Sequence, residues 1–436
     1  MWHSRLLRRK MMKKMTAILI GAGGRGTTYT DIMARVPEKF QVIAVAEPIR
    51  SRRDHIRELH NIPDEYCFED YKPLLALGKI ADLAIICTMD RDHFEPAMMA
   101  IDLCYDLLLE KPIAPTAEEC VRLTENARAK GVRVLICTVL RYTAIFNQLK
   151  NIIDSGRIGR VMSINHEECV GNVHQSHSFV RGNWGNVGRS SNMLLQKSCH
   201  DLDILQWLIG KRCKKIQSFG TLSYFTEANA PAGAPDRCIE GCPAAETCPY
   251  NAVKLYYDDK NNRWFRTAST KLHAPTDEDV LKALRETQYG KCVYKCDNDV
   301  VDHQSVNMLF EDDITVTFTM CAFNKGGRFI HIMGTKGELW ASMDKQEKPI
   351  LVYDFETKEN VEYPFAGKDG ITNGHGGGDT GIVEALYEYL TGTYNGFSVS
   401  EVRTSVNNHH LVFAAEQSRM NNTVVDLEEY VKSLNV

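Results

Sequence analysis

A glycine-rich turn between an apolar strand and a helix constrains this chain more than any other feature. The apolar run at residues 17–20 leads into G-A-G-G-R-G at residues 21–26, which fits G-x-G-x-x-G. Gly21 permits the tight turn, Gly23 lets the backbone approach a pyrophosphate, and Gly26 lets the following helix pack against the strand. The N-terminus of that helix supplies N–H donors and partial positive charge to phosphates. The turn therefore predicts a dinucleotide-binding site.

Strands and helices alternate over the first 140 residues. Four further short apolar segments are typical of strands, at residues 41–46, 82–87, 105–109 and 132–137, and amphipathic stretches such as 116–130 lie between them. Nearly continuous apolar strands separated by helices indicate a parallel sheet that is covered on both faces. We therefore expect an α/β fold that begins with a doubly wound Rossmann domain over residues 15–140.

The end of the second strand bears on the choice of cofactor. A carboxylate at Glu47 can accept hydrogen bonds from both ribose hydroxyls, which favours NAD over NADP. Arg50, Arg52 and Arg53 follow closely, and one of them could hold the 2′-phosphate of NADP instead. A solvated helix face is the other interpretation of these arginines, so NADP remains the alternative cofactor.

Candidate proton-transfer groups occur in two places. Lys111 closes the strand at residues 105–109, and the carboxyl ends of parallel strands line the ligand crevice. There Lys111 can contact a substrate hydroxyl and share its proton, although a surface lysine is the alternative. Lys197 and His200 are three residues apart in an expected helix, so they share a face and form a plausible proton-transfer pair. A structural histidine on a polar face is the alternative there.

Two polar loops are candidates for substrate binding. The segment at residues 177–184 contains Arg181 and Trp184, and an aromatic plate with polar donors suits a sugar. A plain surface loop is the alternative. The glycine-rich segment at residues 374–379 contains His375 and forms either a lid near the site or a helix cap at Asp379.

These features together resemble the Gfo/Idh/MocA family of oxidoreductases. The matching motifs are the glycine turn, Glu110-Lys111-Pro112, Arg141-Tyr142, Cys199-His200-Asp201-Leu202-Asp203 and Gly334-Thr335-Lys336-Gly337-Glu338-Leu339. The resemblance spans roughly residues 16–340. It implies that residues 141–436 form a second α/β domain with a large, open, mostly antiparallel sheet, which binds substrate and mediates dimers, tetramers or other homo-oligomers.

The resemblance also implies roles for individual residues. Lys111 and His200 fall on the catalytic lysine and histidine of the family, with Lys197 as a further catalytic candidate. The expected cofactor contacts are Gly21, Gly23, Arg25, Gly26, Glu47, Thr88, His93 and Glu110. The expected substrate contacts are Arg141, Tyr142, Arg181, Trp184 and His375.

One position departs from the family pattern. Many family dehydrogenases carry an aspartate four residues before the histidine, where this chain has Gln196. The nearby ionisable residue is Lys197, and a polar residue at this spacing is similar to the family's glycoside-cleaving branch. Those enzymes oxidise a ring hydroxyl, eliminate the aglycone, add water and reduce the sugar again, so that NAD is recycled.

A cysteine cluster falls in an apparent insertion at about residues 226–300. The chain has 14 cysteines, most of which read as small buried hydrophobes. In the insertion, Cys238, Cys242, Cys248 and Cys292 could supply four thiolates to a structural zinc ion, which would fold a segment too polar to make its own core. Cys296 is the spare thiol. Iron–sulfur ligation and free thiols are the alternatives.

Length and composition limit the remaining classes. The chain has 436 residues, 25% of them charged, and a formal net charge of −4. No strongly basic face suggests nucleic acid, and no apolar run approaches the roughly 20 residues that cross a bilayer. We expect a cytoplasmic protein with no nucleic-acid or membrane partner. A basic leader at residues 1–14 is expected to be disordered, with targeting as the alternative.

The leading hypothesis is an NAD(H)-dependent oxidoreductase that acts on a hydroxyl or keto carbon of a sugar. The second hypothesis is a glycosidase that works by transient oxidation at C3 with recycled NAD. A non-catalytic NAD-binding sensor is the third, and the pairing of Lys111 with His200 argues against it.

Overall fold

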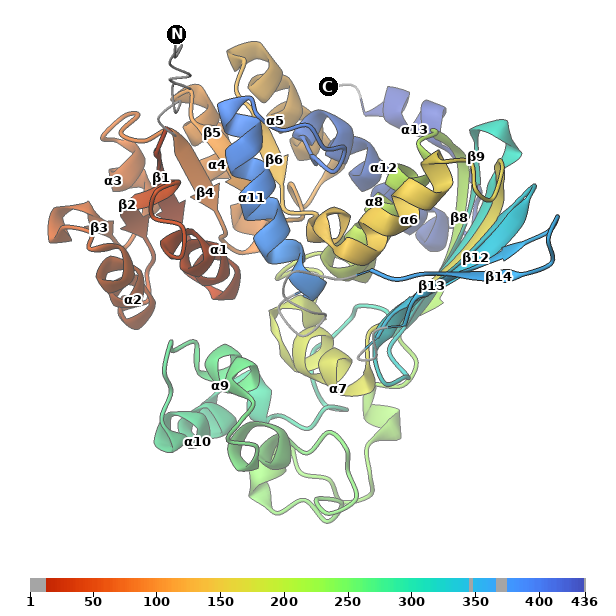
Figure 1. The fold of residues 1–436 in the computed structure, drawn as a ribbon. Helices are drawn as coiled ribbons and strands as arrows, with labels where there is room; N and C mark the ends of the chain where they lie inside the picture. Colours follow the sequence, from red (N-terminus) through yellow and green to blue (C-terminus); the bar gives the residue numbers. More distant parts are fainter. Residues whose placement is uncertain (1–12, 345–347, 366–374, 435–436) are drawn as a thin grey trace, which may run out of the picture.

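A computed structural model of the chain describes residues 13–344, 348–365 and 375–434. The described part contains two β-sheets with their helices, and a helical insertion that lies below them in Figure 1. Most of the expected leader at residues 1–14 lies outside the described residues. No helix in the described ranges is long and apolar enough to cross a membrane.

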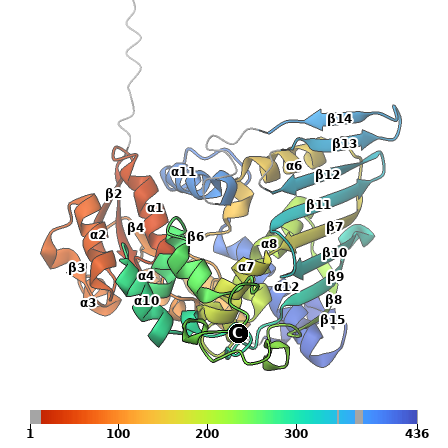
Figure 2. The same cartoon turned by 90° about the horizontal axis from the view of Figure 1, so that it is seen from below.

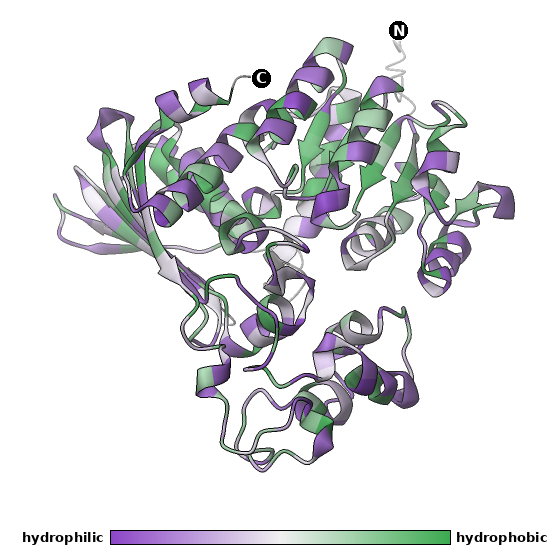
Figure 3. Ribbon diagram, turned by 180° about the vertical axis from the view of Figure 1, so that it is seen from behind, coloured by the Kyte–Doolittle hydropathy of each residue, from purple (hydrophilic) through white to green (hydrophobic). Residues whose placement is uncertain are grey.

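The N-terminal sheet has six parallel strands in the order β3-β2-β1-β4-β5-β6. The strands are β1 (Met15–Ile20), β2 (Phe40–Ala46), β3 (Cys67–Phe68), β4 (Leu83–Ile86), β5 (Asp106–Leu109) and β6 (Val134–Ile136). The helices between them are α1 (Gly24–Ala34), α2 (Arg50–His60), α3 (Tyr71–Leu75), α4 (Phe94–Asp102) and α5 (Ala117–Lys130). Figure 3 shows hydrophobic strands beneath helices whose outer faces are hydrophilic. The doubly wound sheet expected from the sequence is confirmed.

Two helices from the C-terminal part of the chain also cover the parallel sheet. They are α11 (Gly378–Thr391) and α12 (Val402–Asn421). Leu386 of α11 joins the apolar cluster that contains Leu19. Val406 of α12 joins the cluster on the other face, which contains Ile18. Both faces of β1 are therefore buried, partly by chain that lies far away in sequence.

The second sheet has nine strands in the order β14-β13-β12-β11-β7-β10-β9-β8-β15, and only the pair β7 and β10 is parallel. The strands are β7 (Val161–Cys169), β8 (Cys213–Thr221), β9 (His303–Phe310), β10 (Thr315–Cys321), β11 (Gly327–Gly334), β12 (Gly337–Met343), β13 (Ile350–Asp354), β14 (Asn360–Tyr363) and β15 (Val425–Asp426). In Figure 2 the helices lie on one face of this sheet. They are α6 (Ala144–Asp154), α8 (Cys199–Ile209) and α12, with α13 (Leu427–Ser433) near β15. The open, mostly antiparallel sheet is confirmed.

The insertion lies between β8 and β9 and is helical. Its main helices are the π-helix η9 (Val253–Asp258), α9 (Arg263–Thr270) and α10 (Asp277–Glu286), with short turns η7 (Glu227–Asn229), η8 (Cys238–Glu240) and η10 (Gln288–Gly290). It packs on the segment after β7, which forms α7 (Asn172–His174) and the π-helix η4 (Gln175–Arg181). Two apolar clusters, one around Phe225 and Tyr294 and one around Tyr256 and Phe265, give the insertion a core of its own.

Candidate functional site

The glycine turn is built as a cradle for phosphate. Gly21 has φ +90°, and a Cβ there would lie 2.6 Å from the carbonyl oxygen of Cys87. A Cβ at Gly26 would lie 2.1 Å from the carbonyl oxygen of Gly21, so both positions require glycine. A Cβ at Gly24, where α1 begins, would meet no heavy atom within 4 Å among the described residues. The turn thus leaves open space at a helix N-terminus, which fits a dinucleotide pyrophosphate.

Glu47 is buried beside this turn, as expected for a cofactor-binding carboxylate. It accepts hydrogen bonds from the backbone N–H of Ala22 (2.7 Å) and of Ile49 (3.0 Å). Of the nearby arginines, Arg53 donates hydrogen bonds to the Glu47 carbonyl and to the Glu69 carboxylate. A second arginine, Arg50, is largely exposed beside Asp54. Arg52 is the arginine that faces the turn, since its Nη1 atom lies 3.8 Å from a Cβ built at Gly23.

Arg25 pairs with two carboxylates that lie far from it in the sequence, Glu110 and Asp379. The Arg25 Nε atom donates to Glu110 Oε1 at 2.8 Å, and its Nη2 atom lies 2.6 Å from Asp379 Oδ1. Burial opposes ionisation of Glu110, but Arg25 and Lys111 hold the pKa of its carboxyl below the ordinary value. The expectation that Asp379 caps a helix is wrong, because Gly377 is the N-cap of α11 and the carboxylate of Asp379 binds Arg25. This ion-pair network fixes the turn against α11.

Lys111 points away from β5 toward the second half of the chain. Its backbone N–H donates to Glu110 Oε2 (2.9 Å), and its Nζ atom donates to the carbonyl oxygen of Gln196 (2.6 Å). The peptide bond from Lys111 to Pro112 is cis.

The ring of His93 is buried behind this segment. It lies 2.6 Å from the Pro112 carbonyl through Nδ1 and 3.2 Å from the Thr88 carbonyl through Nε2. His93 and Thr88 therefore brace the backbone next to Lys111, and any cofactor contact they make is additional to that role.

The helix that carries Lys197 and His200 is not a regular α-helix. It begins as the π-helix η6 (Leu194–Ser198) and continues as α8, with His200 buried in the first turn. The wider π winding means that the α-helical spacing does not by itself place the two side chains on one face. The Lys197 Nζ atom instead lies 3.3 Å from Glu168 Oε1 on β7. Burial and the neighbouring Arg328 lower the pKa of Lys197, while Glu168 raises it.

A buried charge network supports Lys197, and sequence reasoning did not find it. Arg328 on β11 pairs with Glu168 Oε2 at 2.6 Å and with Asp201 Oδ1 at 2.8 Å. The same carboxylate of Asp201 lies 2.9 Å from His166 Nε2. Burial raises the pKa of Asp201, but Arg328 and His166 bring it down to about 2. The alternation of β7 put Glu168 and His166 on its inward face, and this was the only signal available in the sequence.

Gln196 does not take the place of an assisting aspartate. Its Nε2 atom donates to Ser190 Oγ (2.5 Å) and Ser191 Oγ (2.6 Å). Ser190 in turn donates to Asp90 at 2.9 Å, and Trp184 Nε1 lies 3.4 Å from the same carboxylate. Trp184 thus joins the loop after η4 to the end of β4, and its indole is partly buried.

Arg141 is not placed to contact a substrate, because it is buried, whereas Tyr142 is partly exposed and its substrate contact stays a prediction. Arg141 is buried, and its Nε and Nη2 atoms both donate to Asp203 at 2.7 Å. The Tyr142 hydroxyl lies 3.0 Å from Ser400 Oγ and accepts from the Ser400 N–H. Asn408 donates to Asp203 as well, so the carboxylate is fully used. These residues tie α8 and α12 to the turn before α6.

Arg181 is also buried, and it lies beside the cysteine cluster. It donates to the Lys291 carbonyl (2.8 Å) and the Tyr250 carbonyl (2.7 Å), and its Nη2 atom lies 3.7 Å from Cys238 Sγ. It is therefore a brace for the insertion and not a substrate contact.

The expected zinc site is not present. Across the described ranges, no group of three or more His, Cys, Asp or Glu side chains could hold a metal ion. Cys238 packs in one apolar cluster of the insertion and Cys242, Cys248 and Cys292 in the other, with Arg181 as the nearby cation. The insertion buries aromatic side chains in both clusters, so it has an apolar core that its polar sequence did not predict.

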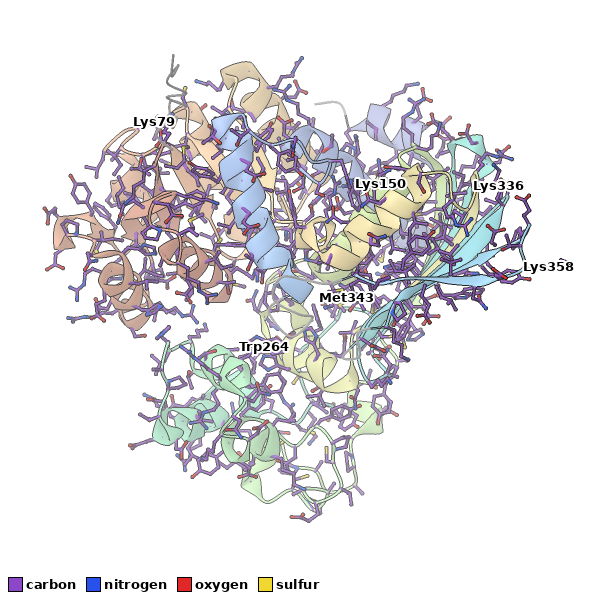
Figure 4. All side chains as sticks on the ribbon, viewed as in Figure 1. Lys79, Lys150, Trp264, Lys336, Met343 and Lys358 are labelled. Atoms are coloured by element: carbon purple, nitrogen blue, oxygen red, sulfur yellow. The ribbon has the colours of Figure 1, made fainter. Side chains whose placement is uncertain are left out.

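The insertion also brings aromatic side chains toward Lys197. Trp264 of α9 is half exposed and lies edge-on to His174, with ring centroids 5.1 Å apart. Figure 4 shows Trp264 at the upper end of the insertion, where it faces the two sheets. Burial and the charge of Lys197 hold the pKa of His174 well below its ordinary value. The side chain of the last candidate, His375 in η12 (His375–Gly377), lies outside the described residues.

The fold and the site define a two-part, dinucleotide-binding oxidoreductase with a lysine at the end of β5. The chain belongs to the Gfo/Idh/MocA family. Residues 15–138 match the family described as oxidoreductase family, NAD-binding Rossmann fold, and residues 146–239 match the GFO/IDH/MocA C-terminal domain.

Individual relatives are distant. YteT of Bacillus subtilis (strain 168), named as an oxidoreductase, is 25% identical over 376 residues, which are 82% of this chain and 81% of the relative. Inositol 2-dehydrogenase of Salmonella paratyphi B is 25% identical over 206 residues, which are 47% of this chain and only 57% of that relative. An oxidoreductase from Agrobacterium radiobacter, solved with NAD+, L-tartaric acid and magnesium, has a TM-score of 0.67 at 13% identity and covers 96% of this chain and 99% of its own. That structural likeness shows the shared fold.

Proposed function

We propose that the chain is a cytoplasmic NAD(H)-dependent oxidoreductase that transfers hydride to or from a hydroxyl or keto carbon of a sugar or polyol. The observation that carries the proposal is the position of Lys111. Lys111 follows β5 at the carboxyl edge of the parallel sheet. Its Nζ atom donates to the Gln196 carbonyl at 2.6 Å, in the helical segment that leads to His200. Inositol 2-dehydrogenases among the relatives support a polyhydroxylated substrate.

The side chains can divide the chemistry between them. NAD, when bound, accepts or returns the hydride. Lys111 contacts the reacting hydroxyl and shares its proton, which passes to His200 or Lys197 as the carbon loses hydride. The O–H proton thus leaves through a side chain, and the carbonyl forms on the same carbon. Burial and the cation Arg328 lower the pKa of Lys197, which suits it to accept a proton.

Redox-neutral glycoside cleavage is the second candidate, and a specific observation favours it. The site holds more basic groups than simple hydride transfer requires, because His174 and Lys197 lie close together. The lowered pKa of His174 keeps its imidazole in the neutral form at pH 7. After oxidation at C3, such a base could remove the proton from the neighbouring carbon as the aglycone leaves. Water addition and return of the hydride would complete the cycle.

One experiment separates these candidates. The purified protein is incubated with a panel of free sugars, polyols and aryl glycosides, and NADH absorbance and aglycone release are followed together. An increase in NADH absorbance with a free sugar supports the dehydrogenase. Aglycone release without net NADH supports the glycosidase. If neither signal appears although the protein binds NADH, the result supports a non-catalytic sensor.

The choice between NAD and NADP has a separate test. The buried carboxylate of Glu47 would repel a 2′-phosphate, so we expect NADH to bind more tightly than NADPH. Fluorescence titration of both cofactors checks this, and Glu47→Gln should narrow the difference. Tighter binding of NADPH by the unaltered protein would indicate that Arg52, and not Glu47, determines the cofactor preference.

A further inference from the structure

The insertion reaches the dinucleotide half of the molecule at two points. In Figure 1, α9 and α10 of the insertion lie below α1 and α2 of the dinucleotide half. His273, between α9 and α10, stacks on His55 of α2 with ring centroids 3.8 Å apart and planes 18° apart. Arg263 Nη2 lies 3.1 Å from His273 Nε2, and Asp31 of α1 lies 3.5 Å from His55 Nε2. This stack is a direct contact between the insertion and the helices of the glycine turn.

A second approach of the insertion to the dinucleotide half involves Tyr289 and Arg52. Tyr289 follows α10 and is set in the aromatic core of the insertion, 5.6 Å from the Tyr256 ring. Burial lowers the pKa of Arg52, whereas Glu47 and Tyr289 raise it, which places the guanidinium of Arg52 near both groups. Arg52 also approaches Gly23, as described above. Tyr289 therefore lies near Arg52, the arginine that approaches Gly23.

The other end of the insertion is tied to the end of β4. Arg91 Nη2 donates to the Val187 carbonyl at 2.9 Å, and the Val187 N–H donates to Asp299 Oδ1 at 2.7 Å. Arg189 pairs with Asp297 in the same loop. The insertion is thus attached on both sides of the strand ends where a dinucleotide binds.

We propose that the insertion forms the outer wall of the NAD site, and that this wall slows release of the bound cofactor. The inference rests on the proposed NAD-dependent function and deepens it. Release of the dinucleotide would require the His55–His273 stack or the Arg52–Tyr289 approach to open.

The test measures cofactor release, not turnover. The full-length protein is loaded with NADH and mixed with a large excess of NAD+, and the decay of bound-NADH fluorescence gives the dissociation rate. His273→Ala and Tyr289→Ala should each release NADH about 10-fold faster than the unaltered protein, since weakened contacts act mainly on dissociation. Arg285→Ala, on the exposed side of α10, is the matched control and should not change the rate.

Two further variants guard against misfolding. Tyr289→Phe keeps the ring and removes the hydroxyl, so it should retain the fold and still speed release. His55→Ala breaks the stack from the opposite side, and the double variant His55→Ala/His273→Ala should release NADH no faster than either single variant. Equal release rates in all variants and the control would overturn the inference while leaving NADH binding intact. Failure of the unaltered protein to bind NADH would overturn the proposed function as well.

Discussion

Lys111 is fixed both at its backbone and at its tip. The carboxylate of Glu110 receives the Lys111 N–H, and the Gln196 carbonyl receives Nζ. A substrate oxygen that displaces the Gln196 carbonyl would meet an ammonium group that is already in place, so little ordering entropy is lost in the reaction. This pre-organisation makes Lys111 the residue on which the proposed chemistry depends most.

We predict that Lys111→Met lowers turnover by about 100-fold or more, because a positioned proton-transfer group contributes about 10²–10⁴-fold. NADH affinity should stay close to that of the unaltered protein, since Lys111 touches none of the residues of the glycine turn in the contacts given above. Steady-state rates and NADH titration measure the two quantities. Lys79→Met, at the far edge of the dinucleotide half (Figure 4), is the control. Near-normal turnover in the Lys111 variant would remove this residue from the mechanism.

At the scale of elements, a buried arginine helps to hold the insertion in place. Arg181 extends from the end of η4 into the insertion and donates to the carbonyls of Lys291 and Tyr250. Its Nη1 atom has no hydrogen-bond partner among the described residues, so the guanidinium is not fully satisfied. The insertion is therefore held by this buried polar tie together with aromatic packing.

We predict that Arg181→Met loosens residues 226–300, because two buried carbonyls lose their donor at a cost of about 1–3 kcal/mol each. Limited proteolysis mapped by mass spectrometry should show faster cleavage within that range. Arg212→Met, whose side chain is largely exposed, should leave the cleavage pattern unchanged. A chelator should have no effect on either variant, and a strong effect would restore the zinc hypothesis.

Local pattern predicted the elements better than it predicted the partners of side chains. The alternating apolar runs gave the strands of the parallel sheet, and the glycine turn gave its dinucleotide site, since both depend on residues adjacent in sequence. The Arg25–Asp379 and Arg141–Asp203 pairs join residues that are far apart in the chain. Arg141 therefore looked like a substrate ligand when its real partner was a buried carboxylate. No periodicity in the sequence reports such pairings.

At the scale of the whole molecule, one face of the nine-stranded sheet is bare in the described part of the chain. Figure 2 shows the helices on the opposite face only. The bare face carries partly exposed apolar side chains, among them Met162, Phe219 and Trp340, and the Trp340 ring stacks on His331 at 4.5 Å. An apolar surface of this kind is typical of a subunit interface. We propose that homo-oligomers form through it.

We predict that Trp340→Glu shifts the protein to a smaller species in analytical ultracentrifugation, because a buried unpaired charge destabilises an interface. Tyr66→Glu, an exposed aromatic beyond α2, is the control and should leave the sedimentation unchanged. An unaltered protein that sediments as a monomer would contradict the proposal directly.

The buried histidines predict how the whole molecule responds to acid. Burial lowers the pKa of His177 to about 3 and the pKa values of His409 and His410 to about 4. His409 is further constrained by its bonds, because it accepts the Ile113 N–H on Nε2 and donates from Nδ1 to the Ser405 carbonyl. Protonation would break the first of these bonds, so the native state excludes the charged imidazole.

The sign of the effect follows from proton uptake. An unfolded histidine has a pKa near 6.5, so between pH 6.5 and about 4 the unfolded chain binds more protons than the native one. Stability is therefore complete above pH 6.5 and falls as the pH drops toward 4, by about 1.4 kcal/mol per pH unit for each buried histidine. Urea unfolding at pH 7, 6 and 5 should show this loss, and His409→Gln should make the slope shallower. A free energy of unfolding that stays constant from pH 7 to 5 would show that these imidazoles titrate normally in the native state.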